Sequence, residues 1–271
     1  MRDRTVAMPW GRLRVWEAGE GPGRLLALHG LGGSGRYFAG LAARLDGRYT
    51  LVAPDLGGFG SSSTPRAPTD RAFHLSTLDA LTGDGGPWVV LGHSLGGVLS
   101  LLFAGHRPDR VAALGMVSSP FPAPRPSWDP AAWRGARSIL PRTVAGVARV
   151  TWPVLSLPAQ AFTDYPPSVV RDFGRQSFRS RAWTLWSLWS DPALEGFVRS
   201  AAAELPRGAP VLLRHAEDDR SVPVASLAAW SALLPGADAA TVAAGGHQVL
   251  LRSNFAPVTP WLAALPVTDH G

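Results

Sequence analysis

The sequence predicts an α/β fold, in which a mostly parallel central sheet is covered by helices on both faces and carries a helical insertion. Short apolar runs without polar alternation recur along the chain, and segments of helix length separate them. This pattern is typical of parallel strands that are buried on both faces. Glycine-rich turns follow several of these runs directly. One internal stretch rich in proline and tryptophan breaks the rhythm, which indicates an insertion.

The elements follow in chain order. A hairpin is expected from residues 5–8 and 12–18, since Pro9-Trp10-Gly11 between them is a turn sequence. Six buried strands are then expected at residues 24–28, 49–53, 88–91, 111–117, 211–215 and 239–243. Apolar spacing predicts helices over residues 40–45 and 98–104.

Residues 121–205 are predicted to form a helical cap, so that residues 1–120 and 206–271 make the core domain. Alternating prolines open the segment, and it contains six of the eleven tryptophans. It lies between two predicted strands and therefore belongs at their carboxyl edge, where open α/β sheets bind ligands. Candidate substrate contacts are Trp128, Trp152, Trp183 and Trp186. The alternative is that these tryptophans only form the core of the cap.

Composition limits the chemistry. The 271 residues include no cysteine, which excludes a disulfide scaffold, thiolate metal sites and a cysteine nucleophile. All 26 basic residues are arginine, and the net charge is +6. The excess of positive charge is local, because residues 125–181 contain nine arginines and only three aspartates. No basic stripe within a recognition motif accompanies it, so no nucleic-acid partner is expected.

The expected location is the cytoplasm, with no membrane contact. No run of about 18 apolar residues is present, and the first residues lack the apolar segment of a signal peptide. No His, Asp or Glu cluster has metal-ligand spacing. The sequence therefore predicts no metal and no cofactor, and it predicts a small-molecule substrate as the partner.

The strongest motif is Gly92-His93-Ser94-Leu95-Gly96, which matches G-x-S-x-G. In this turn between a strand and a helix, small residues on either side of the serine let the two elements approach closely and leave Oγ exposed. The predicted strand before the motif and the apolar segment after it supply the required context. Ser94 is therefore the candidate nucleophile.

A serine nucleophile needs a histidine base and a carboxylate that orients it, in the chain order Ser, acid, His for this turn. The strand at residues 211–215 runs into the candidate acids Glu217, Asp218 and Asp219. His247 follows the last predicted strand and is the candidate base. The order is satisfied.

An oxyanion hole is expected from two backbone N–H groups. One belongs to Leu95, directly after the nucleophile and at a helix N-terminus. The other is expected from the loop His29-Gly30-Leu31-Gly32-Gly33, with Leu31 as the donor.

The chain resembles the α/β-hydrolase superfamily, and in particular its compact members with a cap. The segments that carry the resemblance are LLALHGLGGS (25–34), VAPDLGGFGSS (52–62), VVLGHSLGG (89–97), HAEDDRSVP (215–223) and GGHQ (245–248). The resemblance implies Asp219 as the acid, four residues before the proline of Val-Pro, and leaves Asp218 and Glu217 in a solvated loop. Relatives that cleave carbon–halogen bonds or open epoxides carry aspartate at the elbow, so Ser94 argues against both reactions. His29 and His93 are expected to support loops.

Rival interpretations stay open. Residues 30–35 form a G-x-G-x-x-G after a strand, and Asp55 lies 20 residues further on, which is the spacing of a nicotinamide-dinucleotide fingerprint in an oxidoreductase. A structural role in the turn is the favoured reading of Asp55. A carbon–carbon hydrolase, a biosynthetic non-hydrolytic enzyme and a non-catalytic binding protein would each fit the same fold. The favoured hypothesis is a serine hydrolase that cleaves a carboxylic ester, a lactone or a thioester of a small apolar or aromatic substrate through an acyl-enzyme.

Overall fold

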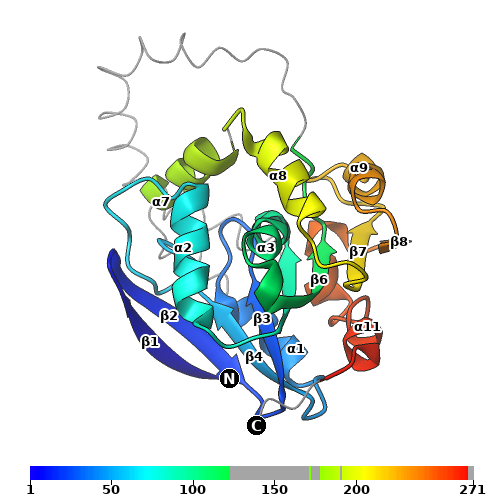
Figure 1. Ribbon diagram of the computed structural model, residues 1–271, viewed down its shortest axis with the longest axis horizontal. Helices are drawn as coiled ribbons and strands as arrows, with labels where there is room; N and C mark the ends of the chain where they lie inside the picture. Colours follow the sequence, from blue (N-terminus) through cyan, green and yellow to red (C-terminus); the bar gives the residue numbers. More distant parts are fainter. Residues whose placement is uncertain (123–170, 172–177, 190, 268–271) are drawn as a thin grey trace.

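The computed structural model describes residues 1–122, 171, 178–189 and 191–267 (Figure 1). Their framework is an eight-stranded sheet in the order β1-β2-β4-β3-β5-β6-β7-β8. The strands are β1 (Arg2–Met8), β2 (Gly11–Ala18), β3 (Gly23–Leu28), β4 (Tyr49–Pro54), β5 (Trp88–His93), β6 (Val111–Val117), β7 (Val211–Ala216) and β8 (Asp238–Val242). β1 and β2 form an antiparallel hairpin, β2 pairs antiparallel with β4, and all pairs from β4 to β8 are parallel. The predicted mostly parallel α/β sheet is confirmed.

Helices cover both faces of this sheet (Figure 1). The longer α-helices are α2 (Arg71–Thr82), α3 (Leu95–His106), α8 (Leu194–Ala203) and α9 (Ala225–Leu233). The shorter ones are α1 (Ala39–Ala42), α7 (Phe178–Trp183), α10 (Val249–Arg252) and α11 (Thr259–Ala264). Single turns of 3₁₀ helix occur at η1 (Gly35–Phe38), η2 (Pro108–Arg110) and η5 (Gly246–Gln248), and η4 (Thr184–Trp189) is a π-helix.

The core consists of two apolar clusters, one on each face of the sheet. Leu26 and Leu28 of β3 belong to the cluster beneath α2, α3, α8 and α9. Leu25 and Ala27 belong to the cluster beneath α1, α10 and α11. Successive side chains of a strand point to opposite faces, so a strand that packs on both sides has no polar alternation. This is the physical reason for the apolar runs in the sequence.

Two predicted helices differ in extent from the observed ones. The helix expected over residues 40–45 is only the four-residue α1, preceded by η1. Leu45 is nonetheless buried, although it lies after the end of α1. The apolar residues there are therefore spaced for burial of a turn and not for a longer helix. By contrast, α3 begins three residues before the predicted 98–104 and ends two residues after it. Its first turn contains Gly96 and Gly97, which are weak helix formers and do not indicate a helix in the sequence.

Most of the predicted cap at 121–205 lies outside the described residues. The structure describes α7, η4 and α8 within it. α8 packs directly on α3 of the core, where a Cβ added to Gly105 would lie 2.3 Å from the Cα of Ala201. The division of the chain into a core and a cap at 121–205 stays a prediction.

Candidate active site

The turn between β5 and α3 holds Ser94 in an unusual backbone conformation. Its φ is 55° and its ψ is −124°, a region that costs a residue with a side chain about 1–3 kcal/mol. A Cβ added to Gly92 would lie 2.2 Å from the carbonyl oxygen of Gly96, and one added to Gly96 would lie 2.1 Å from that of Leu28. The strand, the turn and the helix therefore fit together only with glycine at both positions.

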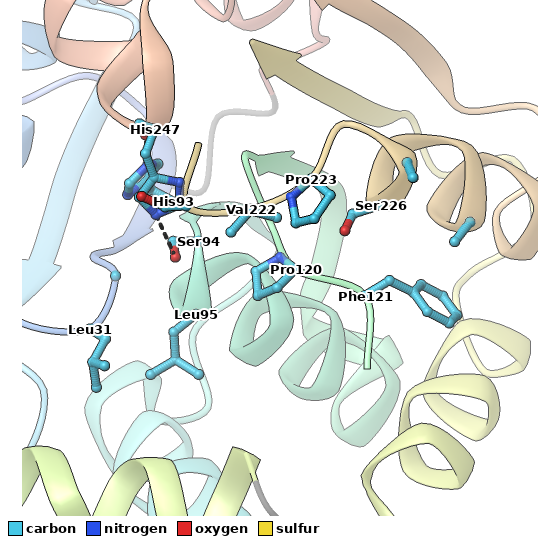
Figure 2. Close-up of a pocket in the computed structure, with 14 residues that line it drawn as sticks. Leu31, His93, Ser94, Leu95, Pro120, Phe121, Val222, Pro223, Ser226 and His247 are labelled. Carbon is cyan, nitrogen blue, oxygen red and sulfur yellow. Dashed lines mark hydrogen bonds between the residues drawn. The ribbon is translucent and has the colours of Figure 1, made fainter. Parts of the chain in front are cut away.

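Ser94, His247 and Asp219 lie together at the carboxyl edge of the sheet. Figure 2 shows the first two and the hydrogen bond between them. The Ser94 Oγ is 3.0 Å from Nε2 of His247, and Nδ1 of the same ring is 2.9 Å from Oδ2 of Asp219. Because Asp219 can only accept when ionised, Nδ1–H donates to it, and Nε2 is then the acceptor for the Ser94 hydroxyl. This arrangement can take a proton from Ser94.

Asp219 is surrounded by donors. Its Oδ1 accepts from the N–H groups of Ser221 and Val222 at 2.8 and 2.9 Å. Its Oδ2 also lies 3.4 Å from Nε2 of the buried His215. Burial alone raises the pKa of this carboxyl, but the hydrogen bonds from His215, His247 and the Val222 N–H outweigh burial and hold the pKa well below its ordinary value. Asp219 is therefore a stable anion that orients the His247 ring.

The two predicted oxyanion donors lie beside Ser94 on the same cavity (Figure 2). Leu95 is the first residue of α3, where a backbone N–H has no intrahelical acceptor. Leu31 belongs to the loop after β3. Gly30 lets this loop approach the turn, since a Cβ there would lie 2.9 Å from the Cβ of Ser94. Both residues thus line the cavity at Ser94, and their role as oxyanion donors stays a prediction.

His29 and His93 support loops, as expected. His29 accepts from the Leu56 N–H at 3.0 Å and donates to the Gly30 carbonyl at 2.8 Å, and burial lowers its pKa to about 4. His93 donates from Nε2 to the carbonyl oxygen of His247 at 2.6 Å. Burial, followed by the proximity of His247, lowers the pKa of His93 to about 3. Both rings are therefore neutral donors at neutral pH.

Tyr37 holds the His93 ring from its other side. The two rings stack with centroids 5.0 Å apart and planes 19° apart. The His93 side chain thus lies between a fixed aromatic ring and the loop that carries His247. The family resemblance implies a supporting role for His93, but the specific hydrogen bond to the His247 backbone has no signature in the motif.

Asp218 was predicted to lie in a solvated loop, and its carboxylate also binds the backbone next to His247. It is exposed, but its Oδ1 accepts from the Gly246 N–H at 2.7 Å and its Oδ2 from the Gly245 N–H at 3.3 Å. The hydrogen bond from Gly246 is the main reason that the pKa of this carboxyl lies below its ordinary value. The predicted solvated position is therefore confirmed, and the side chain in addition ties down the loop that presents His247. Glu217 is exposed and accepts only from Thr241 Oγ1 among the contacts described.

Asp55 does not have the geometry of a ribose ligand. Its carboxylate is fully buried, with Oδ1 accepting from Trp16 Nε1 and the Gly35 N–H and Oδ2 accepting from the Ser61 N–H. These donors pin the loop of residues 30–35 to the end of β4. The buried hydrogen bonds agree with a structural role for Asp55. Because protein donors already occupy its carboxylate, Asp55 is not placed to accept from the ribose of a dinucleotide.

A cavity of about 700 Å³ opens at Ser94. It extends from the triad between the end of β6 and α9, and Phe121 and Ser226 lie along it (Figure 2). Of the predicted substrate contacts, Trp128 and Trp152 lie outside the described residues, as does the Trp186 side chain. Trp183 is half-buried and is not among the described residues that line the cavity.

Two further features concern the described ranges as a whole. None of the helices there combines the length and apolar character needed to cross a lipid bilayer. Within the same residues, no group of three or more His, Asp or Glu side chains is arranged to hold a metal ion.

Comparison with known sequences gives a consistent picture. The family profile described as alpha/beta hydrolase fold matches residues 23–151. A pimeloyl-[acyl-carrier protein] methyl ester esterase of Xanthomonas axonopodis pv. citri is 30% identical over 259 residues, covering 86% of this chain and 90% of that protein. Lipase LipV of Mycobacterium tuberculosis is 44% identical over 100 residues, and an uncharacterized protein of Mycobacterium bovis is 38% identical over 104. This chain matches only 37% and 30% of the lengths of those two mycobacterial proteins.

Solved structures agree on the fold. The haloalkane dehalogenase DatA from Agrobacterium tumefaciens C58 superposes with a TM-score of 0.76 at 20% identity, covering 97% of this chain and 96% of that one. The thioesterase domain from the curacin biosynthetic pathway gives 0.72 at 21% identity, covering 98% and 99%. At these identities the likeness concerns the fold alone.

Proposed function

Since this chain belongs to the α/β-hydrolase fold family, we propose that it is a serine hydrolase that cleaves a carboxylic ester, or the related carbonyl of a lactone or thioester. The observation that carries the proposal is the continuous hydrogen-bonded chain from Ser94 Oγ through the His247 ring to Asp219. The relative with the longest match reported above is named as a methyl ester esterase, which supports an ester as the substrate class.

In the first half-reaction, Ser94 Oγ attacks the carbonyl carbon while its proton passes to Nε2 of His247. The tetrahedral intermediate carries its negative charge on the former carbonyl oxygen, where the Leu31 and Leu95 N–H groups donate to it. The intermediate collapses as the carbon–oxygen bond to the alcohol breaks. The leaving oxygen takes the proton from Nε2, and the acyl group stays on Ser94.

In the second half-reaction, a water molecule attacks the acyl-enzyme and gives a proton to Nε2 of His247. The second tetrahedral intermediate expels Ser94 Oγ, which takes this proton back. The products are the alcohol and the carboxylic acid, and one water is consumed. Asp219 stays ionised throughout and stabilises the positive charge that the His247 ring carries between the two proton transfers.

The proposal is tested with a fluorophosphonate serine probe and p-nitrophenyl acetate. The protein is expected to take up one label at Ser94 and to hydrolyse the ester. Ser94→Ala is expected to lose the label and to lower kcat by several orders of magnitude, with unchanged thermal unfolding. Near-full ester turnover by Ser94→Ala would overturn the mechanism.

A further inference from the structure

The cavity beside Ser94 owes its shape to a row of small side chains. α9 contributes Ala225, Ser226 and Ala229 to its lining. Ala229 lies four positions after Ala225 and three after Ser226, so each is its neighbour on the helix surface and the three short side chains leave space on one side of the helix. A larger residue at any of them would enter the cavity.

The helix that bears this row is firmly anchored. Trp230, the residue after Ala229, is 2% exposed and belongs to the core cluster beneath α9. Its Nε1–H donates to the carbonyl oxygen of Ser119 at 2.8 Å. This bond ties α9 to the end of β6, so the space between them is a feature of the fold and not a loosely packed surface.

The opposite wall is an aromatic ring held in place by the same tryptophan. Phe121 packs edge-on against Trp230, with ring centroids 4.7 Å apart and planes at 67°. Pro120 and Val222 line the cavity between this wall and the triad (Figure 2). None of the described residues that line the cavity carries a formal charge apart from a protonated histidine. Among these described residues a buried carboxylate or ammonium group would find no charged partner, and its desolvation would be costly.

We propose that this slot between Phe121 and the small face of α9 binds the uncharged hydrocarbon acyl chain of the substrate, and that Ala229 sets how long that chain can be. The inference rests on the ester hydrolysis proposed above. The leaving oxygen must lie at Nε2 of His247, from which it takes its proton. Phe121 and Ser226 lie away from His247, beyond Pro120 and Val222 (Figure 2). The substituent that runs toward them is therefore the acyl chain and not the alcohol.

The test uses two series of esters. In the first, p-nitrophenyl esters vary the acyl chain from acetate to dodecanoate; in the second, acetate esters vary the alcohol over the same lengths. For the wild type, kcat/KM is expected to rise about fourfold per added methylene in the first series until the slot is filled. The second series is expected to be nearly flat.

The decisive variant is Ala229→Phe, and Ala228→Phe is its matched control. Ala228 lies on the same helix but is exposed and is not part of the lining. Ala229→Phe is expected to lose at least about tenfold in kcat/KM for the octanoate ester. The loss is expressed within each variant as the ratio of kcat/KM for the octanoate ester to that for the acetate ester, and Ala228→Phe keeps the wild-type ratio. Should Ala229→Phe unfold at a lower temperature, Ser226→Leu fills the same slot by a smaller change.

The outcomes separate the two proposals. Unchanged length profiles in both Ala229→Phe and Ser226→Leu, with acetate ester turnover intact, overturn the slot and leave serine hydrolysis standing. A length preference that follows the alcohol series and shifts with Ala229→Phe overturns the acyl assignment. No ester turnover and no fluorophosphonate label in the wild type overturn the proposed function itself, and the slot with it.

Discussion

Ser94 and His247 lie 3.0 Å apart, but different kinds of structure hold them. Every residue of β5 is buried, and α3 after Ser94 packs into the core along most of its length. His247 instead follows β8, an edge strand with four of its five residues exposed. Steric fit fixes the first region. The second depends on three hydrogen-bonded ties, from Asp219 to the ring, from Asp218 to Gly245 and Gly246, and from His93 to the His247 carbonyl.

This contrast predicts that substitutions in the two regions lower activity in two different ways. A change in the region around Ser94 acts mainly on the stability of the fold, and activity falls because less protein is folded. A change in the ties around His247 acts mainly on kcat, and the fold survives. Measuring both quantities for each variant distinguishes the two regions.

The largest effect is expected from Asp219→Asn. The amide oxygen can still accept from Ser221 and Val222, so the loop should keep its shape. The amide N–H₂, however, faces Nδ1 of His247, which must then accept and leave its proton on Nε2. In that tautomer the ring cannot take the proton of Ser94, and kcat is expected to fall about 10⁴-fold, as in other serine triads. Steady-state kinetics with a p-nitrophenyl ester and thermal unfolding measure the two quantities.

The neighbouring acid is the control. Asp218→Asn removes a charge from a loop tie but leaves the His247 ring and Asp219 untouched, so its loss in kcat is expected to be less than about tenfold. Equal losses in the two variants would contradict the assignment of Asp219 as the orienting acid.

Gly96→Ala attacks the other region. The added Cβ would lie 2.1 Å from the Leu28 carbonyl oxygen, so β3 and α3 must move apart. The free energy of unfolding is expected to drop by about 3 kcal/mol, measured by urea denaturation. Gly196→Ala in α8 is the matched control, since a Cβ there meets nothing within 4 Å. Alanine is the better helix former, so the control is expected to be as stable as the wild type or more stable. If Gly96→Ala matched it, steric fit would not be what fixes Ser94.

His93→Phe tests the tie that joins the two regions. The phenyl ring can still stack on Tyr37, but it cannot donate to the His247 carbonyl. We expect kcat to fall about 10- to 100-fold with little change in KM, because the base is displaced while the substrate cavity remains. His93→Gln retains an N–H of similar reach and should recover part of the loss. Equal kcat in the two variants would show that the hydrogen bond does not position His247.

The same variant has a smaller, pH-dependent signature. The unfolded chain binds a proton at His93 near the ordinary pKa of about 6.5, whereas the folded protein binds it only near about 3. Between these values the unfolded state holds more protons at this position, so stability falls as the pH falls, by up to about 1.4 kcal/mol per pH unit. His93→Phe lacks this contribution. Its free energy of unfolding should therefore decline less steeply than that of the wild type between pH 6 and 4, and a parallel decline would contradict the buried neutral state of His93.

Sequence patterns were most informative where one physical requirement dominates. Strands buried on both faces must be apolar throughout, and all eight strands were predicted, most to within one or two residues. The candidates Ser94 and His247 followed from a turn that demands small residues and from their order along the chain, whereas the choice of Asp219 among three neighbouring acids came from the resemblance to a known family. The structure brings these three side chains together, and Leu31 and Leu95 with them.

Other features depend on local or tertiary detail. α2 was not predicted, although its signals are present, since Asp70 caps it by accepting from the Phe73 N–H and Gly83 ends it at a φ of 55°. The tie from His93 to the His247 carbonyl joins residues 154 positions apart and depends on how the sheet edge folds back. The cavity beside α9 depends on small side chains. Small residues also occur on many helices that line no cavity, so they form no sequence motif that predicts one.

The strand order also has a consequence for how the site comes into being. β5 lies in the interior of the sheet, β8 is its last strand, and Ser94 and His247 are 153 positions apart in the sequence. Contacts between such distant parts of a chain form late, because the long loop must be closed before they contribute. The central strands can collapse while the serine is still chemically inert. A refolding chain, or one leaving the ribosome, is thus expected to react with a serine probe only after its carboxyl-terminal strand has docked. The rate at which the protein becomes reactive with the probe would therefore measure the final step of folding.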